Sequence, residues 1–276
     1  MAAGTKSVLH PTGLVHGHSE CRYLDESIPV LTQVLALDLV QRRDHEAVLK
    51  HPNTGWKLIL HEGGAEVKDK PERNHYGVRV SNNEEVDRAY QYLLANKEKL
   101  GLKKVVKRKE RAGSYSMFLV EPGGNYWEIE SYENRHKAGL PAPIAYPWKT
   151  KLTEERLPGC GYIPQAMTHG TLECVDLDAS VKFYKEGLGL DVITHVPTVK
   201  PHDIKHPSTP WYIASLEIPE KNRKYLTPLQ RYTVCRRITK RADERRVTNC
   251  KIAAKSSASR RSTRSRTSST GKPFAE

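Results

Sequence analysis

Apolar residues are spaced in two alternating ways along the first half of the chain. In some stretches they occupy every second position, which predicts β-strands, and in others they recur every three or four positions, which predicts amphipathic helices. From residue 12 to residue 135 the predicted order is strand, helix and three strands, and then the same order again. The pattern therefore predicts two consecutive β-α-β-β-β units.

The second unit shows this pattern most fully. A strand opens it at His75–Val80, and the following helix has one apolar face, formed by Val86, Ala89, Tyr90, Leu93 and Leu94. Three strands come next, in the segments KKVVKRK, SYSMFLV and NYWEIESY. The turn EPGG at Glu121–Gly124 joins the last two strands and positions the final one.

The opening segment of the first unit is repeated later in the chain. Val15–Ser27 reads VHGHSECRYLDES and Thr168–Ser180 reads THGTLECVDLDAS, with seven identical positions. The same register continues through VLALDLV at 34–40 and GLGLDVI at 187–193. A repeat of this length implies duplicated supersecondary units. We therefore expect a third unit from 166 to about 218, and no fourth unit is recognisable after it.

The segments between and after these units have a different composition. Residues 136–165 are rich in proline and lack periodicity, which predicts a linker. Residues 235–276 form a low-complexity basic tail that we expect to be disordered. The sequence thus predicts an α+β fold with a complete domain at 12–135 and a partial second domain at 166–234. The abrupt change after Val234 favours a truncated or altered C-terminus.

The formal net charge of +13 at first suggests a nucleic-acid partner. Residues 231–276 hold 14 Lys or Arg and 3 Asp or Glu, so the body of the chain is nearly neutral. The predicted tail also lacks aromatic residues that stack on bases, Phe274 apart. We therefore expect no nucleic acid as partner, and binding by the tail is kept only as a weaker third hypothesis.

The remaining composition bears on the compartment. No apolar run approaches the ~20 residues of a membrane-spanning helix, and the first residues contain no apolar signal core. Five scattered cysteines without a CxxC pair fit a reducing compartment. We therefore expect a cytoplasmic protein that does not bind membranes, and we do not expect cysteine ligands in a metal site.

Three residues at matching places in the units suggest a metal site. His16 and His75 open similar strands, and Glu128 lies on the last strand of the second unit. Two imidazoles and one carboxylate on one face leave three positions of an octahedral ion open. This facial triad suits non-haem Fe(II) and also accepts Mn, Co, Ni or Zn, and its open positions admit a substrate. The sequence predicts a divalent metal with Fe(II) favoured.

Two segments resemble a known family, the vicinal oxygen chelate superfamily. HGTLECVDLDASVKFYKEGLGLDVI is similar to its opening strand, helix and "FY…LGL" segment, and VEPGGNYWEIES to its closing strand. The resemblance covers roughly 12–135 and 166–218. The family includes glyoxalase I, extradiol dioxygenases, fosfomycin-resistance proteins and methylmalonyl-CoA epimerase. The resemblance implies paired modules that form a curved, cup-shaped mixed sheet around one divalent metal, with ligands at His16, His75 and Glu128.

Two departures from the family pattern bear on the reaction. Trp56–Leu60 has no carboxylate where glyoxalase I-like members take another ligand, and His61 and Glu62 follow about two residues late. A three-ligand site favours extradiol-dioxygenase-like chemistry on a small molecule with vicinal oxygens. However, Phe118 stands where those dioxygenases carry a tyrosine, and their "G-x-H" histidine is missing. Glyoxalase- or isomerase-like chemistry therefore stays open as an alternative.

Three residues are candidates for the acid/base groups. His18 lies two residues after His16, so it faces the same side of the strand and competes with His16 or serves as a base. His61 and Tyr115 could also carry protons. A lone strand histidine is more often a satisfied surface or core residue, so these assignments depend on the fold.

His169 occupies the position of His16 in the third unit. No second histidine-led strand and no N-x-x-E segment follow it, so we expect His169 to be a remnant of duplication, or part of a site whose other half is absent. The third unit alone would expose the open side of a half-cup, which predicts either pairing with another chain, hence a homo-oligomer, or loose order. A non-catalytic binding protein on the same fold is the second hypothesis, although that branch normally lacks the ligand triad.

Overall fold

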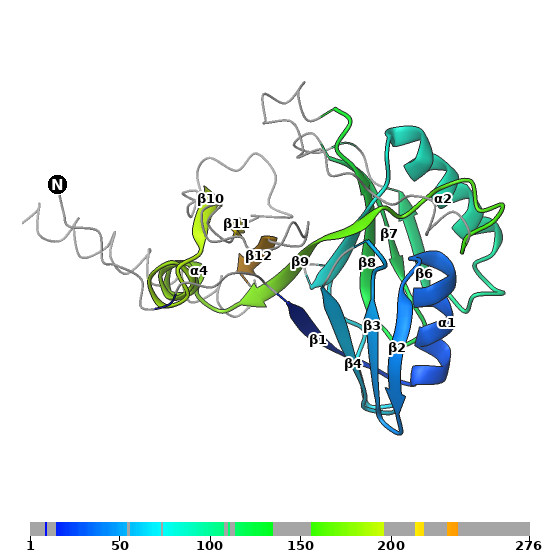
Figure 1. Ribbon diagram of the computed structural model, residues 1–276, viewed down its shortest axis with the longest axis horizontal. Helices are drawn as coiled ribbons and strands as arrows, with labels where there is room; N and C mark the ends of the chain where they lie inside the picture. Colours follow the sequence, from blue (N-terminus) through cyan, green and yellow to red (C-terminus); the bar gives the residue numbers. More distant parts are fainter. Residues whose placement is uncertain are drawn as a thin grey trace, which may run out of the picture. The chain divides into compact units, whose positions relative to one another are not determined.

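The computed structural model describes residues 9, 15–53, 56–72, 74–107, 110, 114–134, 156–195, 213–217 and 231–236. They form an α+β fold of three β-α-β-β-β modules (Figure 1). The first comprises β1 (His16–Cys21), α1 (Leu24–Val34), β2 (Asp38–Arg43), β3 (Glu46–Lys50) and β4 (Lys57–Glu62). The second comprises β5 (His75–Arg79), α2 (Asn83–Ala95), β6 (Lys104–Lys107), β7 (Tyr115–Val120) and β8 (Tyr126–Ser131).

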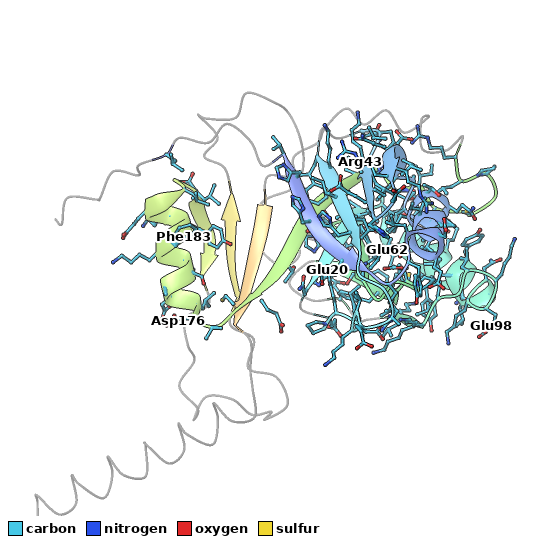
Figure 2. The ribbon with its side chains drawn as sticks, turned by 90° about the horizontal axis from the view of Figure 1, so that it is seen from below. Glu20, Arg43, Glu62, Glu98, Asp176 and Phe183 are labelled. Atoms are coloured by element: carbon cyan, nitrogen blue, oxygen red, sulfur yellow. The ribbon has the colours of Figure 1, made fainter. Side chains whose placement is uncertain are left out.

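The third module has the same order of elements. It comprises β9 (Ala166–Cys174), α4 (Leu177–Lys182) with the π-helical turn η2 (Phe183–Gly187), β10 (Asp191–His195), β11 (Ile213–Glu217) and β12 (Arg231–Arg236). Asp176 caps α4, because its side chain accepts a hydrogen bond of 3.0 Å from the backbone N of Ala179. Figure 2 labels Asp176 and Phe183 on this helical segment.

The strands form two mixed sheets. The first module makes a four-stranded sheet in the order β1-β4-β3-β2. The second and third modules share an eight-stranded sheet in the order β10-β11-β12-β9-β5-β8-β7-β6. Within each module the opening strand runs parallel to the last strand. Figure 2 labels Glu20 on β1 and Glu62 on β4, the outer strand pair of the first module. The other edge of β5 pairs antiparallel with β9. The sheet thus joins the second module to the third, whereas the sequence analysis pairs the first with the second.

The first two modules share a hydrophobic core instead of a sheet. The ring of Tyr76 on β5 lies 5.1 Å from that of Trp56 and 5.8 Å from that of Trp127, and its hydroxyl donates to the carbonyl of His18. Gly17 permits this contact, because a Cβ there would lie 2.6 Å from the Trp56 ring. Since neighbouring residues of a strand face opposite ways, burial of Tyr76 turns the two residues beside it toward the other face.

The described end of the predicted linker packs on this core. Leu157 and Tyr162 are buried, and the Tyr162 hydroxyl donates to the Val34 carbonyl at 2.9 Å. The backbone N of Gln165 then donates to the carbonyl of Arg79 at 2.7 Å, at the end of β5. This segment therefore leads the chain directly to the edge of β5, where β9 begins.

Apart from this packed segment, the predicted domain boundaries stay predictions. β12 includes the first two residues of the predicted basic tail, and the rest of that tail lies outside the described residues. Among the helices that the structure describes, none is both long enough and apolar enough to cross a membrane.

Candidate metal centre

Three side chains from three adjacent strands meet on one face of the eight-stranded sheet. They are His75 on β5, Glu128 on β8 and His169 on β9. The two Nε2 atoms of the histidines lie 3.1 Å apart, and Glu128 Oε2 lies 3.2 Å from His75 Nε2 and 3.1 Å from His169 Nε2. The three ligand-type atoms therefore form a nearly equilateral triangle.

The sheet register explains why these residues meet. Gly77 on β5 lies opposite Glu128 on one side and opposite His169 on the other. His75 is two residues before Gly77, so it faces the same way. A Cβ at Gly77 would lie 2.2 Å from Cε1 of His169. The glycine therefore leaves the space into which the imidazole of His169 fits.

The size of the triangle fits a divalent metal ion. Nitrogen and oxygen ligands lie about 2.1 Å from such ions, which places neighbouring ligands about 3.0 Å apart in octahedral and about 3.4 Å apart in tetrahedral geometry. The observed edges of 3.1 to 3.2 Å fall in this range. Two imidazoles and one carboxylate are also a donor set that first-row transition metals accept.

The electrostatics of Glu128 and His169 support the same role. Burial works against charge on Glu128, but hydrogen bonds from His169 and His75 outweigh burial and hold its pKa well below the usual range. Burial likewise opposes charge on His169, yet Glu130 and Glu128 raise its pKa to about 10. Without a metal the imidazole of His169 therefore carries a second proton and is positively charged. A bound cation would replace that proton, since a metal ligand must be deprotonated.

The Nδ1 atom of each imidazole has an oxygen partner. His75 Nδ1 lies 2.5 Å from the carbonyl O of Glu72, and His169 Nδ1 lies 3.1 Å from Oε1 of Glu130. An imidazole that donates from Nδ1 presents its Nε2 lone pair to a metal. The two Nε2 atoms therefore point inward as potential ligands.

The predicted ligand His16 lies elsewhere, together with two of the predicted acid/base groups. His16 and His18 are on β1 and His61 is on β4, in the four-stranded sheet. His18 Nδ1 and His61 Nε2 are 2.8 Å apart, and the rings of His16 and His18 are 5.3 Å apart. The structure therefore groups His75 and Glu128 with His169 rather than with His16, because β1 packs behind β5 and not beside it.

Tyr115, the third predicted acid/base group, points away from the centre. Its hydroxyl donates to Asp87 on α2 at 2.8 Å. Phe118, three residues later on β7, pairs with Glu128 in register, and its ring lies 5.3 Å from that of His75. The odd spacing between Tyr115 and Phe118 places them on opposite faces of the strand.

The sequence analysis did not assign His169 or Glu130 to the site. A signal for His169 was present, because the repeat gives His16 and His169 the same position and either could meet His75. For Glu130 the signal is its spacing, since it follows Glu128 by two residues and therefore faces the same side of β8.

Comparison with known proteins shows a likeness in structure. No family model and no curated protein matches the chain. A glyoxalase I variant from Zea mays matches 82% of this chain and 70% of its own, with 16% identity and a TM-score of 0.50. A candidate dioxygenase from Bacillus subtilis matches 83% of this chain and 64% of its own, with 12% identity and a TM-score of 0.51.

A shorter likeness completes the comparison. A possible glyoxalase from Bacillus cereus has 25% identity, covers 43% of this chain and 98% of its own, and has a TM-score of 0.37. The two longer matches show that the chain shares its fold with a glyoxalase I and a candidate dioxygenase, which is the fold that the sequence resemblance implies.

Proposed function

We propose that this protein is a divalent-metal enzyme in which His75, Glu128 and His169 hold the metal. The observation that carries the proposal is the triangle of Nε2, Nε2 and Oε2 atoms with edges of 3.1 to 3.2 Å. The exposed fractions of the three side chains are only 10 to 12%. When bound, the metal would supply Lewis-acid chemistry toward a small substrate with two neighbouring oxygens.

The residues around the triangle have separate tasks in this proposal. Phe118 lies edge-on to His75 and supplies an apolar wall that excludes water from one side. Thr171 Oγ1 lies 3.3 Å from His75 Nε2 and offers a hydroxyl to a bound substrate. Tyr126 pairs with His75 in register, and its phenol oxygen lies 3.3 Å from Nζ of Lys104. Lys104 lies on β6, on the other side of β8 from β5, so this hydroxyl, like that of Tyr115, has its partner away from the triangle.

Extradiol-dioxygenase-like chemistry with Fe(II) is the first candidate reaction. In the part of the chain that the structure describes, no fourth ligand-type side chain joins the group. Two histidines and one carboxylate are typical of non-haem iron enzymes that activate dioxygen. Mn, Zn or Ni are the alternative metals.

Glyoxalase- or isomerase-like chemistry is the second candidate. The His75 and His169 rings are ligands in this proposal, and no third histidine of the described residues shares their group. A histidine acid/base for ring cleavage is therefore missing from that group. Glyoxalase- or isomerase-like chemistry does not require a histidine for proton transfer, since a carboxylate or a phenol can also act as the acid/base group.

Metal analysis of anaerobically purified protein tests the proposal. We expect one metal ion per chain in the wild type, loss of the ion in His169→Ala and Glu128→Ala, and retention in His16→Ala as the matched control. Loss in His16→Ala with retention in His169→Ala would return the site to the first module. A wild type that binds no metal would favour a binding protein. Oxygen uptake with Fe(II) and catechols then separates the two reactions.

The structure changes one of the expectations about partners. The sequence predicts that the third module either pairs with another chain or is loosely ordered, but β9 pairs with β5 of its own chain. This removes the original reason for a homo-oligomer, and the oligomeric state stays a prediction. A cytoplasmic location and the absence of a nucleic-acid partner also stay predictions.

A further inference from the structure

Glu130 is a buried carboxylate beside the centre that contributes no atom to the triangle. It follows Glu128 by two residues on β8, and its side chain is 3% exposed. Its Oε1 accepts from Thr168 Oγ1 at 2.7 Å and from the Tyr132 hydroxyl at 2.7 Å, and lies 3.1 Å from His169 Nδ1. Ser114 Oγ donates to Oε2 at 3.1 Å.

These contacts show which strands the carboxylate of Glu130 connects. An ionised carboxylate is costly to bury unless donors satisfy it. Two of its four donors, Thr168 and His169, belong to β9 of the third module, whereas Glu130 lies on β8 of the second. β5 lies between these two strands, so the side chain of Glu130 reaches across β5 to hold β9.

The two histidines of the centre are oriented by different means. Nδ1 of His75 faces the carbonyl of Glu72, a backbone group three residues away in the same segment. His169 comes from another module and has a side-chain acceptor in Glu130 instead. With Nδ1–H donated to Glu130, only Nε2 of His169 can face Glu128 and His75. A ring turned by 180° would lose this bond.

We propose that Glu130 is a positioning residue that fixes His169 as an Nε2 ligand and thereby attaches the third module to the metal centre. This inference rests on the metal site of the proposed function. It assigns to Glu130 no contact with metal or substrate, and its effect passes through the ring of His169.

Metal affinity of Glu130 variants tests this role. Co²⁺ is the probe, with affinity measured by competition with a chelator and geometry by the visible absorption of the bound ion. Loss of such an outer partner typically weakens metal binding 10- to 100-fold, and we expect about that for Glu130→Ala with an altered Co²⁺ spectrum. Glu130→Gln keeps an oxygen that accepts from Nδ1–H, so we expect it to restore most of the affinity.

Glu121 offers a matched control. It is also a fully buried carboxylate, and it accepts from Ser27 Oγ, the backbone N of Gly123 and both the backbone and side-chain nitrogens of Asn125. None of these donors touches the triangle. Glu121→Gln should lower the stability of the fold while leaving Co²⁺ affinity within about twofold of the wild type.

The outcomes separate the two proposals. Failure of the wild type to bind Co²⁺ overturns the metal site itself. Wild-type binding with unchanged affinity and spectrum in both Glu130 variants overturns the positioning role alone. If Glu130→Ala does not fold, the Nδ1 and Nε2 signals of His169 in nitrogen-15 spectra of Zn²⁺-loaded wild type and Glu130→Gln decide. A proton on Nε2 and a metal on Nδ1 would contradict the inference.

Discussion

Gly77 and His169 lie directly opposite each other on β5 and β9, and the imidazole occupies the space that a side chain at residue 77 would fill. A methyl group there would approach the ring to 2.2 Å, far inside van der Waals contact. The position of His169 therefore depends on a glycine in another module.

Gly77→Ala should accordingly weaken metal binding. The new methyl group displaces the His169 ring, and we expect at least a tenfold loss of Co²⁺ affinity, measured by chelator competition. Gly187→Ala is the control, because among the described residues a Cβ there meets the Phe183 ring alone, at an ordinary 3.6 Å. Equal affinities of the two variants would show that the ring of His169 is not needed for binding.

Metal loading should stabilise β9 in particular. The ion would join a ligand on β9 to two ligands on β5 and β8, and a ligand that binds only the folded state lowers local opening. In hydrogen exchange we expect slower exchange at residues 166–174 on addition of Co²⁺ or Zn²⁺. Exchange in β3 of the first module should not change. Equal protection of both strands, or of neither, would contradict a metal centre at the junction of β5 and β9.

His51 should make the fold sensitive to acid. It is buried, its Nε2 donates to the carbonyl of Pro164, and its Nδ1 accepts from the backbone N of Asn53. Burial lowers its pKa from 6.5 to about 3, so the folded state keeps it neutral. Between those two values the unfolded state binds a proton that the folded state does not. The stability that the neutral imidazole contributes is complete above pH 6.5. Below that pH the free energy of unfolding falls by about 1.4 kcal/mol per pH unit, down to about pH 3.

Urea unfolding of the wild type and His51→Gln at several pH values measures this effect. The variant should be less stable at pH 7 because it loses packing and hydrogen bonds. Its stability should nevertheless fall less steeply than that of the wild type between pH 6 and pH 4. Parallel curves for the two proteins would mean that His51 is protonated in the folded state.

Tyr162 tests whether residues 156–165 are part of the packed structure. Its hydroxyl donates a hydrogen bond to the carbonyl of Val34, the last residue of α1. Tyr162→Phe should lower the free energy of unfolding by about 1 to 2 kcal/mol, and Tyr162→Ala by about 3 to 5 kcal/mol. Tyr23→Phe, at an exposed side chain, should change it by less than about 0.5 kcal/mol. If Tyr162→Ala were as stable as the wild type, residues 156–165 would be a linker that does not pack on the core.

The sequence predicts the modules well because their signals are local. Alternation around His75–Val80 and the apolar face of the helix after it depend on residues close together in the chain. His75 and Glu128 could be paired because they open and close one module. Which module supplies the third residue of the triangle is not a local property, since His16 and His169 have similar neighbours in sequence. The choice depends on β9 pairing with β5.

Tyr115 shows a different limit. The face of a strand follows from counting residues, so its odd distance from Phe118 could have excluded it from the side of Glu128. Tyr162 illustrates the opposite problem. The proline-rich composition around it predicts a linker, yet its ring is buried, because one large apolar side chain can dock without any periodic pattern.

The proposed metal centre takes its residues from two different repeats, which has a consequence for mutation. If His75, Glu128 and His169 hold the metal, the second and third copies each supply residues that the other lacks, and a harmful change in either copy would remove the proposed activity. The first copy, which contains His16, contributes none of its described residues to this centre. Random mutagenesis under selection for activity should therefore tolerate replacement of His16 far more often than of His169, although both stand at the same point of the same repeat.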